Sequence, residues 1–379
     1  RPHRTTPMYN IFTDMGAVWG QQFGLEVVNY YAQGDEPTFE QPTFRRSNGF
    51  KATAREVKAV RSAVGINEVQ NFGKFAVTGK DARKWLSTIM AGRIPVAGRM
   101  SLTPMLSPKG RLMGDFTVSC LDENNFQLTA SYGAQEIHYR WFMKNLKGDV
   151  RVRNVSDRRT GFQIAGPKSR ELLSLCTRYD VSTVKFLDVV RMTVGQVDCT
   201  VQRVSYTGDL GYEIYCDPMD QRQLWQTLWN AGQPLGITPF GMRAMMSLRL
   251  DRHFGSWLSE FSPDYTAAET GMDRFISFKK PDDFIGRKAA EAERVGLVNK
   301  VVPQAELMTA AGEWAGRLAE SPTKAIMLSK WLLNRSLDSN RHGAFEDEAW
   351  AQEMASYTKD FQEGVAAFKE RRDVEYRGW

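Results

Sequence analysis

A hairpin in the first third of the chain constrains the fold most strongly. Two strand-like segments, Leu112–Cys120 and Asn125–Ala130, flank the turn residues Asp122-Glu123-Asn124. Strands joined by so short a turn pair antiparallel, because parallel neighbours need a crossover of a dozen or more residues. Strands and helices elsewhere mix without a regular βαβ alternation. The sequence therefore predicts an α+β fold with a mixed or antiparallel sheet, rather than a doubly wound α/β fold.

Local periodicity predicts the remaining elements of this body. Residues 1–50 are rich in Pro, Gly and aromatic residues with little periodicity, so we expect an extended lead-in that wraps the body. The expected helices are Lys51–Val64, Asp81–Met90, Ala134–Leu146, Lys168–Cys176, Pro218–Ala231 and Gly241–Leu250, and the expected strands are Phe72–Thr78, Val150–Val155, Thr160–Ile164 and the β region Val184–Val204.

The character of the chain changes near residue 290, which divides it into a body (1–290) and an all-helical tail (291–379). Apolar residues at helical spacing predict three tail helices, marked by Leu307–Leu318, by Lys324–Asn334 after the cap Ser321-Pro322, and by Trp350, Met354, Tyr357 and Phe361. Such stripes usually form a core or a subunit interface, which leaves open a homo-oligomer assembled through the tail.

Charge and length narrow the class of protein. A chain of 379 residues is expected to hold two or more domains. Residues 1–290 carry 38 Lys+Arg against 29 Asp+Glu, a basic balance that suits an anionic ligand. Nucleic acid is the less favoured partner, because the chain has no basic run of five, no zinc finger and no RNP-like motif. No apolar run approaches the roughly 20 residues of a membrane span.

Several site types are excluded by what the sequence lacks. The four cysteines have no C-x-x-C spacing and the four histidines form no cluster, so we expect reduced thiols in a cytosol-like compartment and no metal site. There is no G-x-x-x-x-G-K-[ST] or G-x-G-x-x-G motif, so no flavin or nicotinamide fold is expected within the chain. The chain opens without an initiator Met, and we expect a preceding segment.

Two stretches carry most of the chemistry. Tyr206–Ile214 (YTGDLGYEI) places Asp209 and Glu213 four residues apart among tyrosines and glycines, and Ser247–Asp251 (SLRLD) sets Arg249 between leucines. Carboxylates accept hydrogen bonds from ring N–H groups, aromatic rings stack on flat faces, and glycines let a ligand approach the backbone. These stretches therefore suit a flat, amide-like heterocycle.

These residues resemble the Y-x-G-[ED]-x-G-[YFW]-E and S-L-R-L-E stretches of tetrahydrofolate-dependent aminomethyltransferases, the glycine-cleavage T-protein family. The folate half of dimethylglycine and sarcosine dehydrogenases looks closer still. The resemblance covers about residues 1–290 and includes Phe72–Phe75, Val77–Ala82, Pro104–Gly110, Gly114–Val118, Ala165–Pro167 and Phe284–Arg287.

The resemblance implies an enzyme that uses tetrahydrofolate to accept one carbon, as methylene or methyl, from a methylated amine or a methyl sulfonium compound. Asp115, in Gly114–Val118, lies where the family carries its central Asp and is expected to stabilise the positive charge of the donor. The expected folate-binding residues are Tyr206, Asp209, Glu213, Arg249 and Tyr132. Most relatives have Glu where this chain has Asp209, which shortens the reach of that carboxylate.

A second resemblance concerns the tail. Glu291–Pro303 and Asp360–Arg372 are similar to the late segment of crotonases (enoyl-CoA hydratases), whose catalytic loops lie upstream of that segment and have no counterpart here. In aminomethyltransferases a small β-barrel follows the F-I-G-R segment, and here helices are expected instead. The alternatives are a non-catalytic folate-binding or assembly subunit and an acyl-CoA-binding crotonase-type protein.

The first resemblance also implies a partner and a compartment. Arg1–Phe12 resembles the junction that follows the flavin half of the dehydrogenases, so a flavin-containing dehydrogenase half or partner is expected. We expect the cytoplasm, or the mitochondrial matrix in a eukaryote, with no membrane and no nucleic acid.

Overall fold

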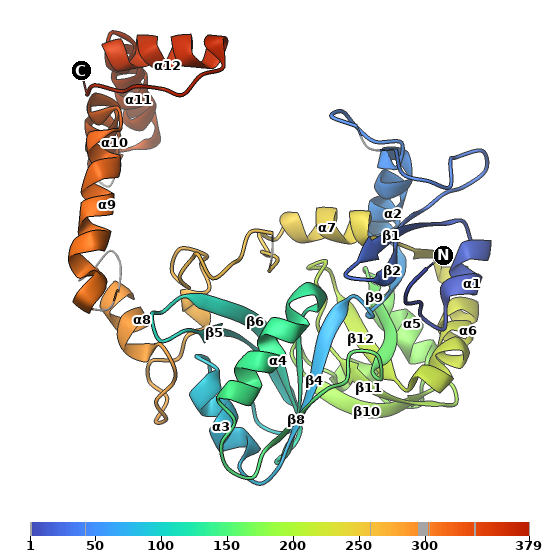
Figure 1. The fold of residues 1–379 in the computed structure, drawn as a ribbon. Coiled ribbons are helices and arrows are strands. Elements are labelled where there is room, and N and C mark those ends of the chain that lie inside the picture. The colour runs from blue at the N-terminus through green and yellow to red at the C-terminus, as the bar shows by residue number, and fades with distance from the viewer. Residues whose placement is uncertain are drawn as a thin grey trace. The chain divides into compact units, whose positions relative to one another are not determined.

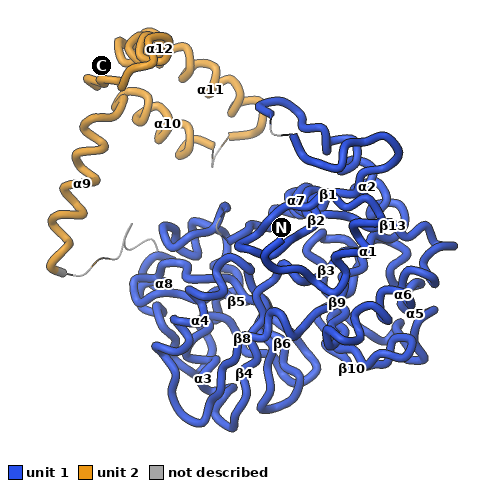
Figure 2. Tube along the Cα trace, turned by 45° about the vertical axis from the view of Figure 1, so that its right-hand side comes forward, with its two compact units in different colours: residues 1–299 blue, residues 300–379 orange. Residues whose placement is uncertain are grey.

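The computed structural model describes residues 2–41, 43–257, 259–294, 302, 304–336 and 339–378. The chain divides into two compact units, residues 1–299 and 300–379 (Figure 2). Among the described residues, strands occur only in the first unit, and the second is helical (Figure 1). The predicted α+β body with an all-helical tail is therefore confirmed.

The first unit contains three sheets and eight α-helices within its described residues. Its helices are α1 (Tyr9–Asp14), α2 (Phe50–Ser62), α3 (Ala82–Ile89), α4 (Gln135–Lys144), α5 (Ser169–Cys176), α6 (Gln221–Gly232), α7 (Met242–Leu250) and α8 (Arg287–Arg294). Its strands are β1 (Ala17–Gln22), β2 (Leu25–Tyr31), β3 (Val64–Glu68), β4 (Phe72–Thr78), β5 (Arg99–Leu106), β6 (Leu112–Asp122), β7 (Asn125–Ser131), β8 (Arg151–Asn154), β9 (Thr160–Ala165), β10 (Val189–Val194), β11 (Val197–Gln202), β12 (Gly211–Cys216) and β13 (Ile237–Pro239).

Each of the two large sheets buries one face under its own helices. The six-stranded sheet has the order β10-β11-β12-β9-β3-β13, with only β3 and β13 parallel. Alternate residues such as Ile164, Tyr212 and Ile214 pack against leucines of α5 and α6. The antiparallel five-stranded sheet, β5-β6-β7-β4-β8, packs its apolar face against α3 and α4 in the same way.

The opposite faces of both sheets carry mainly polar side chains and are buried or partly buried. Directly opposed residues form the row Asn67–Gln163–Glu213–Gln202 across the six-stranded sheet and the row Lys74–Thr129–Thr117–Leu102 across the five-stranded sheet. The charges of Lys74 on the five-stranded sheet and Glu213 on the six-stranded sheet affect each other's pKa, so the two polar faces lie against each other. Buried polar groups need partners inside the protein or from a ligand, so this layer is the natural place for a binding site.

The amino-terminal region differs from its predicted extended form. Residues 1–50 contain α1 and the antiparallel hairpin β1–β2, and Phe12 of α1 packs edge-on against Trp225 of α6. The buried carboxylate of Glu56 in α2 accepts hydrogen bonds from the backbone N–H groups of Tyr31 (2.7 Å) and Gly241 (2.9 Å). Alternation in β1 is weak in the sequence, and a register shift between Val18 and Trp19 interrupts it further.

Most other predicted elements lie within two or three residues of the observed ones. The strand Phe72–Thr78 matches in full, and the hairpin β6–β7 turns at Asp122–Asn125 as expected. The region Val184–Val204 is a hairpin, β10–β11, rather than one continuous strand. In α2, the residues that are buried are Ala52, Glu56 and Val60. Because Glu56 is an acid, an apolar pattern in the sequence does not identify it as part of the buried face.

The second unit consists of α9 (Leu307–Ala319), α10 (Thr323–Ser336), α11 (Arg341–Ser356) and α12 (Lys359–Glu370). The stripe predicted to form one helix is divided between α11 and α12, because Thr358 caps α12 by accepting a hydrogen bond from the Phe361 N–H. Trp350 and Phe361 are each about half exposed within this unit. No helix in the described residues is long and apolar enough to cross a membrane.

Candidate functional site

A cavity of about 1410 Å³ opens at one end of the polar layer of the first unit. Both large sheets line it, together with α7, the tip of the hairpin β1–β2, and residues 251–257 and 259–276, which we call the strap. Aromatic side chains of Phe72, Tyr206, Phe254, Trp257 and Phe275 contribute to its wall. Ligand sites are usually concave, mostly apolar and furnished with a few polar groups, and this cavity has that character.

Asp115 is one of those polar groups. It lies on β6 opposite Pro104, on the polar face, and its half-buried carboxyl group lines the cavity. Burial raises the pKa of Asp115 to about 6. No arginine or lysine forms an ion pair with it among the described residues. A carboxylate held without a cation in a poorly solvated cavity attracts a positively charged ligand.

Glu213 lines the same cavity from β12. Gly211, Glu213 and Tyr215 share a face of this strand, and the Tyr215 hydroxyl donates to Glu213 Oε2 at 2.6 Å. Burial raises the pKa of Glu213 to about 6, although the Tyr215 hydrogen bond and the charge of Lys74 act in the opposite direction. Lys74 is fully buried on β4, and burial lowers its pKa to about 7.

The turn before β12 carries the second predicted carboxylate. Asp209 Oδ1 accepts from Arg61 Nη1 at 2.6 Å, while its Oδ2 is buried with no hydrogen-bond partner among the described residues. Gly208 has a φ of +75°, and a Cβ there would lie 2.2 Å from Arg252 Cγ, so this turn requires glycine. Asp209 therefore lines the cavity with one oxygen bound to Arg61, while its other oxygen is enclosed by the protein.

Tyr206 contributes a ring rather than a free hydroxyl. Its O–H donates to the carbonyl of Gly255 in the strap at 2.8 Å, and its ring lies near the rings of Phe72 and Phe254. Burial raises its pKa to about 12, so the hydroxyl stays protonated at neutral pH. The predicted stacking role fits this placement in the cavity wall.

Arg249 binds the protein. Its guanidinium forms two hydrogen bonds with Glu260, at 2.8 and 2.9 Å, and a third with the carbonyl of Phe254 at 2.8 Å. The side chain is almost fully buried in α7 and does not line the cavity. Arg249 therefore holds the strap against α7. It supports the cavity wall without contacting the cavity itself.

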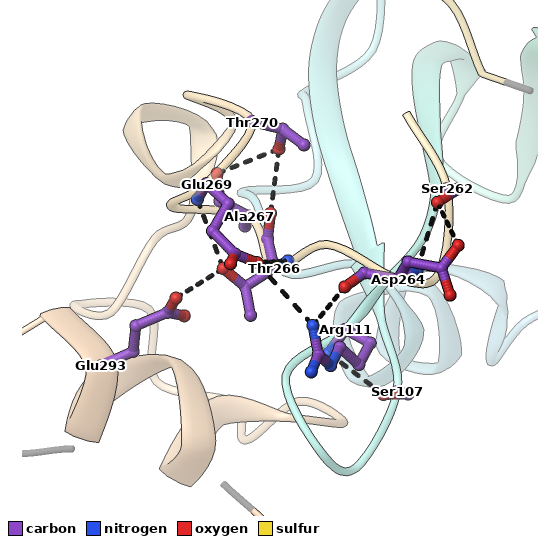
Figure 3. Close-up of polar contacts among 9 residues, drawn as sticks. All are labelled: Ser107, Arg111, Ser262, Asp264, Thr266, Ala267, Glu269, Thr270 and Glu293. Atoms are coloured by element: carbon purple, nitrogen blue, oxygen red, sulfur yellow. Dashed lines mark hydrogen bonds and ion pairs between the residues drawn. The ribbon is translucent and has the colours of Figure 1, made fainter. Parts of the chain in front are cut away.

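Arg111 holds the middle of the strap (Figure 3). It lies in the turn between β5 and β6, donates to the carbonyl of Asp264, and forms an ion pair with Glu269 at 3.7 Å. Thr266 donates to Glu293 of α8, which ties the strap to the end of the described part of this unit. Thr270 and Met272, which follow directly, line the cavity.

Tyr132 is the one predicted site residue that lies away from both the cavity and its supports. It follows β7, is buried, and has the guanidinium of Arg4 about 5.8 Å from its ring centre. Ser131, its neighbour, lines the cavity while Tyr132 does not. Its hydroxyl is buried without a hydrogen-bond partner in the described residues.

Other classes of site have little support in the described residues. All four cysteines are free and buried, and burial raises the pKa of each thiol. No group of three or more His, Cys, Asp or Glu side chains is arranged to hold a metal ion in the described part of the chain. The cavity thus offers carboxylates and aromatic faces, together with the basic side chains of Arg203, Arg243 and Arg274.

Comparison with known families decides where the chain belongs. Residues 8–280 match the model of the GCVT N-terminal domain. The chain belongs to this family. An aminomethyltransferase of Clostridium botulinum (strain Okra) is 30% identical over 305 residues, which covers 79% of this chain and 77% of that protein. The aminomethyltransferase T of the Bartonella henselae glycine cleavage system has the same fold, with a TM-score of 0.66 and 20% identity over 77% of this chain and 75% of its own.

A second group of relatives is much longer. Human mitochondrial dimethylglycine dehydrogenase is 34% identical over 289 residues, which covers 75% of this chain but only 33% of the human protein. The chain thus spans about a third of the length of this relative. The tail matches a separate family model, enoyl-CoA hydratase/isomerase, over residues 286–378. The GCVT-type body and the crotonase-like tail predicted from the sequence are both confirmed.

Three residues that shape this GCVT-type site were not among the predicted ones. Lys74 lies in the motif Phe72–Phe75, but nothing in the sequence shows that its ammonium is buried near Glu213. Arg61 lies on α2, 148 residues before its partner Asp209. Glu260 lies in the strap, where the sequence has no periodicity. The first two depend on contacts distant in sequence, and Glu260 meets Arg249 across 11 residues of irregular chain, so a single sequence carries no signal for any of them.

Proposed function

We propose that this chain catalyses tetrahydrofolate-dependent one-carbon transfer, taking a methylene group from an iminium already formed by oxidation of a methylated amine, or a methyl group from a methyl sulfonium donor. The observation that carries the proposal is the placement of Asp115, Asp209 and Glu213 around one aromatic-walled cavity. Membership in a family that includes aminomethyltransferases supports the same reaction class.

The residues present fit a reduced folate. Its pterin ring presents N–H groups on a flat, amide-like edge, and the carboxylate of Asp209, which lines the cavity beside Arg61, is one acceptor for them. Glu213 offers a second acceptor, and Tyr206 offers an aromatic face. When bound, the reduced folate supplies a nucleophilic nitrogen that accepts the carbon.

The role of the protein is then to position and to stabilise charge. Both donor classes carry a positive charge, on nitrogen as an iminium or on sulfur as a sulfonium. Asp115, a carboxylate without a cation partner in the described residues, stabilises that charge inside the cavity. Holding two small reactants together in a site shielded from water contributes most of the remaining rate.

Calorimetry with tetrahydrofolate, followed by a turnover assay, tests the proposal. We expect binding heat from the folded wild-type protein and, with a donor present, one-carbon folate identified by mass spectrometry. An amine-derived iminium and a methyl sulfonium are supplied in separate reactions, because a mass difference between methylene and methyl products identifies the donor class. No binding heat at saturating folate contradicts the proposal.

One observation favours a second candidate, a folate-binding or assembly subunit without turnover. After β13, the described residues form helices and turns and no strand, so the barrel expected from the family is replaced. Tight folate binding without product from either donor supports this candidate. The crotonase-like tail suggests acyl-CoA binding as a further outcome, which titration with an acyl-CoA ester tests.

The longer relatives suggest which partner supplies the donor and in which compartment the reaction occurs. Because dimethylglycine dehydrogenases extend well beyond the matched region, we propose a flavin-containing half or partner that generates the iminium donor. The mitochondrial names of these relatives favour the mitochondrial matrix over the cytoplasm in a eukaryote.

A further inference from the structure

Three arginines line the cavity, and they differ in what they already bind. Arg243 forms an ion pair with Glu40 at 2.8 Å. Arg274 lies on the exposed side of the strap, with its guanidinium over the ring of Phe275. Arg203 is partly buried, and it forms no ion pair with a carboxylate among the described residues. A partly buried cation without a counter-ion is a group that a ligand anion can stabilise.

The guanidinium of Arg203 is held by one of its nitrogens. Its Nη1 donates to the carbonyl of Val184 at 2.8 Å. Nε and Nη2 have no hydrogen-bond partner among the described residues, and neither belongs to the polar atoms that the protein encloses completely. These two nitrogens form one edge of the planar group, and two parallel N–H donors match the two oxygens of a carboxylate. The Val184 contact therefore fixes the guanidinium and leaves its paired edge accessible.

Backbone contacts place Arg203 where the two large sheets meet. Its carbonyl accepts from the N–H of Leu187 at 3.0 Å, and the carbonyl of Leu187 accepts from the N–H of Met100 on β5 at 2.9 Å. The same strand pairs with β6, where Asp115 lies directly opposite Pro104. Arg203 and Asp115 line one cavity and form no ion pair with each other. The cavity therefore presents a cation and an anion separately.

We propose that Arg203 binds a carboxylate group of the ligand through Nε and Nη2. This inference rests on the proposed function, which supplies two sources of a carboxylate. One is the glutamyl part of the folate, and the other is a donor that carries a carboxylate beside its positive charge. In either case Arg203 contributes affinity and selectivity for the anionic ligand and leaves the charge of the reacting group to Asp115.

Two pairs of ligands that differ by carboxylate groups test the inference by calorimetry on the full chain. The first pair is tetrahydrofolate and its diamide, in which both glutamyl carboxylates are amides. The second pair is trimethylglycine and tetramethylammonium, stable analogues of a charged donor, titrated into the folate-loaded protein. We expect Arg203→Gln to weaken the carboxylate-bearing member of one pair by roughly tenfold or more, and to leave its counterpart within about twofold. The pair that responds identifies the source of the carboxylate.

Two further variants separate charge from geometry. Arg203→Lys keeps the charge and loses the paired edge, so its affinity should lie between those of the wild type and Arg203→Gln. Arg191→Gln, at an exposed position of β10 outside the cavity lining, removes the same charge and should leave every Kd unchanged. Thermal unfolding of each variant is measured in parallel, and if Arg203→Gln does not fold, Arg203→Lys gives the comparison of the two pairs.

Three outcomes overturn the inference while the wild type still binds tetrahydrofolate. The first is that wild-type affinities do not distinguish the members of either pair, and the second is that Arg203→Gln leaves every affinity unchanged. The third is an equal loss for both members of each pair, which would show that Arg203 supports the wall without recognising a carboxylate. A wild-type protein that gives no heat with tetrahydrofolate refutes the proposed function itself, which is a different result.

Discussion

The hydroxyl of Tyr215 donates to the carboxylate of Glu213 at 2.6 Å, from the same face of the same strand. Glu213 lines the cavity, whereas Tyr215 is buried behind it. The hydrogen bond stabilises the ionised form of Glu213 and opposes the effect of burial on its pKa. One buried tyrosine therefore adjusts the charge of a residue that faces the ligand.

This relationship predicts the behaviour of Tyr215→Phe. Loss of the donor raises the pKa of Glu213 above its present value of about 6. If the ionised carboxylate accepts the pterin N–H, folate affinity falls at pH 6.5 and stays nearly unchanged at pH 8, where Glu213 ionises in both proteins. Calorimetric titration at the two pH values measures the effect. Equal losses at both would show that the tyrosine acts through packing alone.

Glu213→Gln removes the charge at that position. A hydrogen bond to a charged group contributes about 1.5–3 kcal/mol, so we expect folate binding to weaken by roughly tenfold or more at pH 8. The variant should also lose the part of the pH dependence of binding that lies near pH 6. Binding within twofold of the wild type would remove Glu213 from the recognition of the ligand.

Asp115 is expected to act on turnover rather than on folate affinity. Burial raises its pKa to about 6, so turnover should rise as pH increases through 6 and the carboxylate becomes ionised. Asp115→Asn should lower turnover at least tenfold, flatten this rise and leave the folate Kd within about twofold. Steady-state rates from pH 5 to 8 measure both effects. Unchanged turnover would exclude the residue from the mechanism.

A variant of Glu260 tests whether the attachment of the strap to α7 affects folate binding. Glu260 receives two hydrogen bonds from the buried Arg249, and its own side chain is 46% exposed. Because of that exposure, Glu260→Gln should cost only about 1 kcal/mol of stability. It should nevertheless weaken folate binding, because residues 254–257 of the strap line the cavity. Glu269→Gln, which loosens the Arg111 attachment instead, is the matched comparison.

The sequence predicted the local elements of this protein better than it predicted their contacts. Strand β4 and the hairpin β6–β7 follow from alternation and turn residues, which are properties of neighbours in the chain. Asp115, Asp209 and Glu213 lie together in one cavity as the motifs suggested. Arg249 was expected to bind folate, but it binds Glu260 instead, because the strap folds back onto α7.

The errors have a common physical origin. The hairpin β1–β2 was taken for an extended lead-in because its pairing, not its pattern, determines its form. Tyr132 was expected in the site, but β7 ends at Ser131, and Tyr132 begins a 3-10 turn that does not line the cavity. Lys74 was not singled out, because burial of an ammonium depends on which strands stack across the polar layer.

The buried ammonium of Lys74 should make the stability of the protein depend on pH. Burial lowers the pKa of Lys74 from its ordinary value to about 7 in the folded protein. Between pH 7 and about 10 the unfolded chain therefore binds more protons than the folded one, so Lys74 makes the free energy of unfolding rise with pH in this window. Lys74→Met should flatten that rise. Denaturant unfolding at pH 7, 8 and 9 measures it.

Lys84→Met, on the exposed side of α3, is the control and should leave the slope as it is in the wild type. A second readout connects Lys74 to the site: its charge lowers the pKa of Glu213, so Lys74→Met should raise that pKa and shift the pH dependence of folate binding upward. A variant with the wild-type stability slope would show that Lys74 is not titrating near pH 7. A variant with an unshifted binding profile would show that the polar layer does not transmit its charge to the cavity.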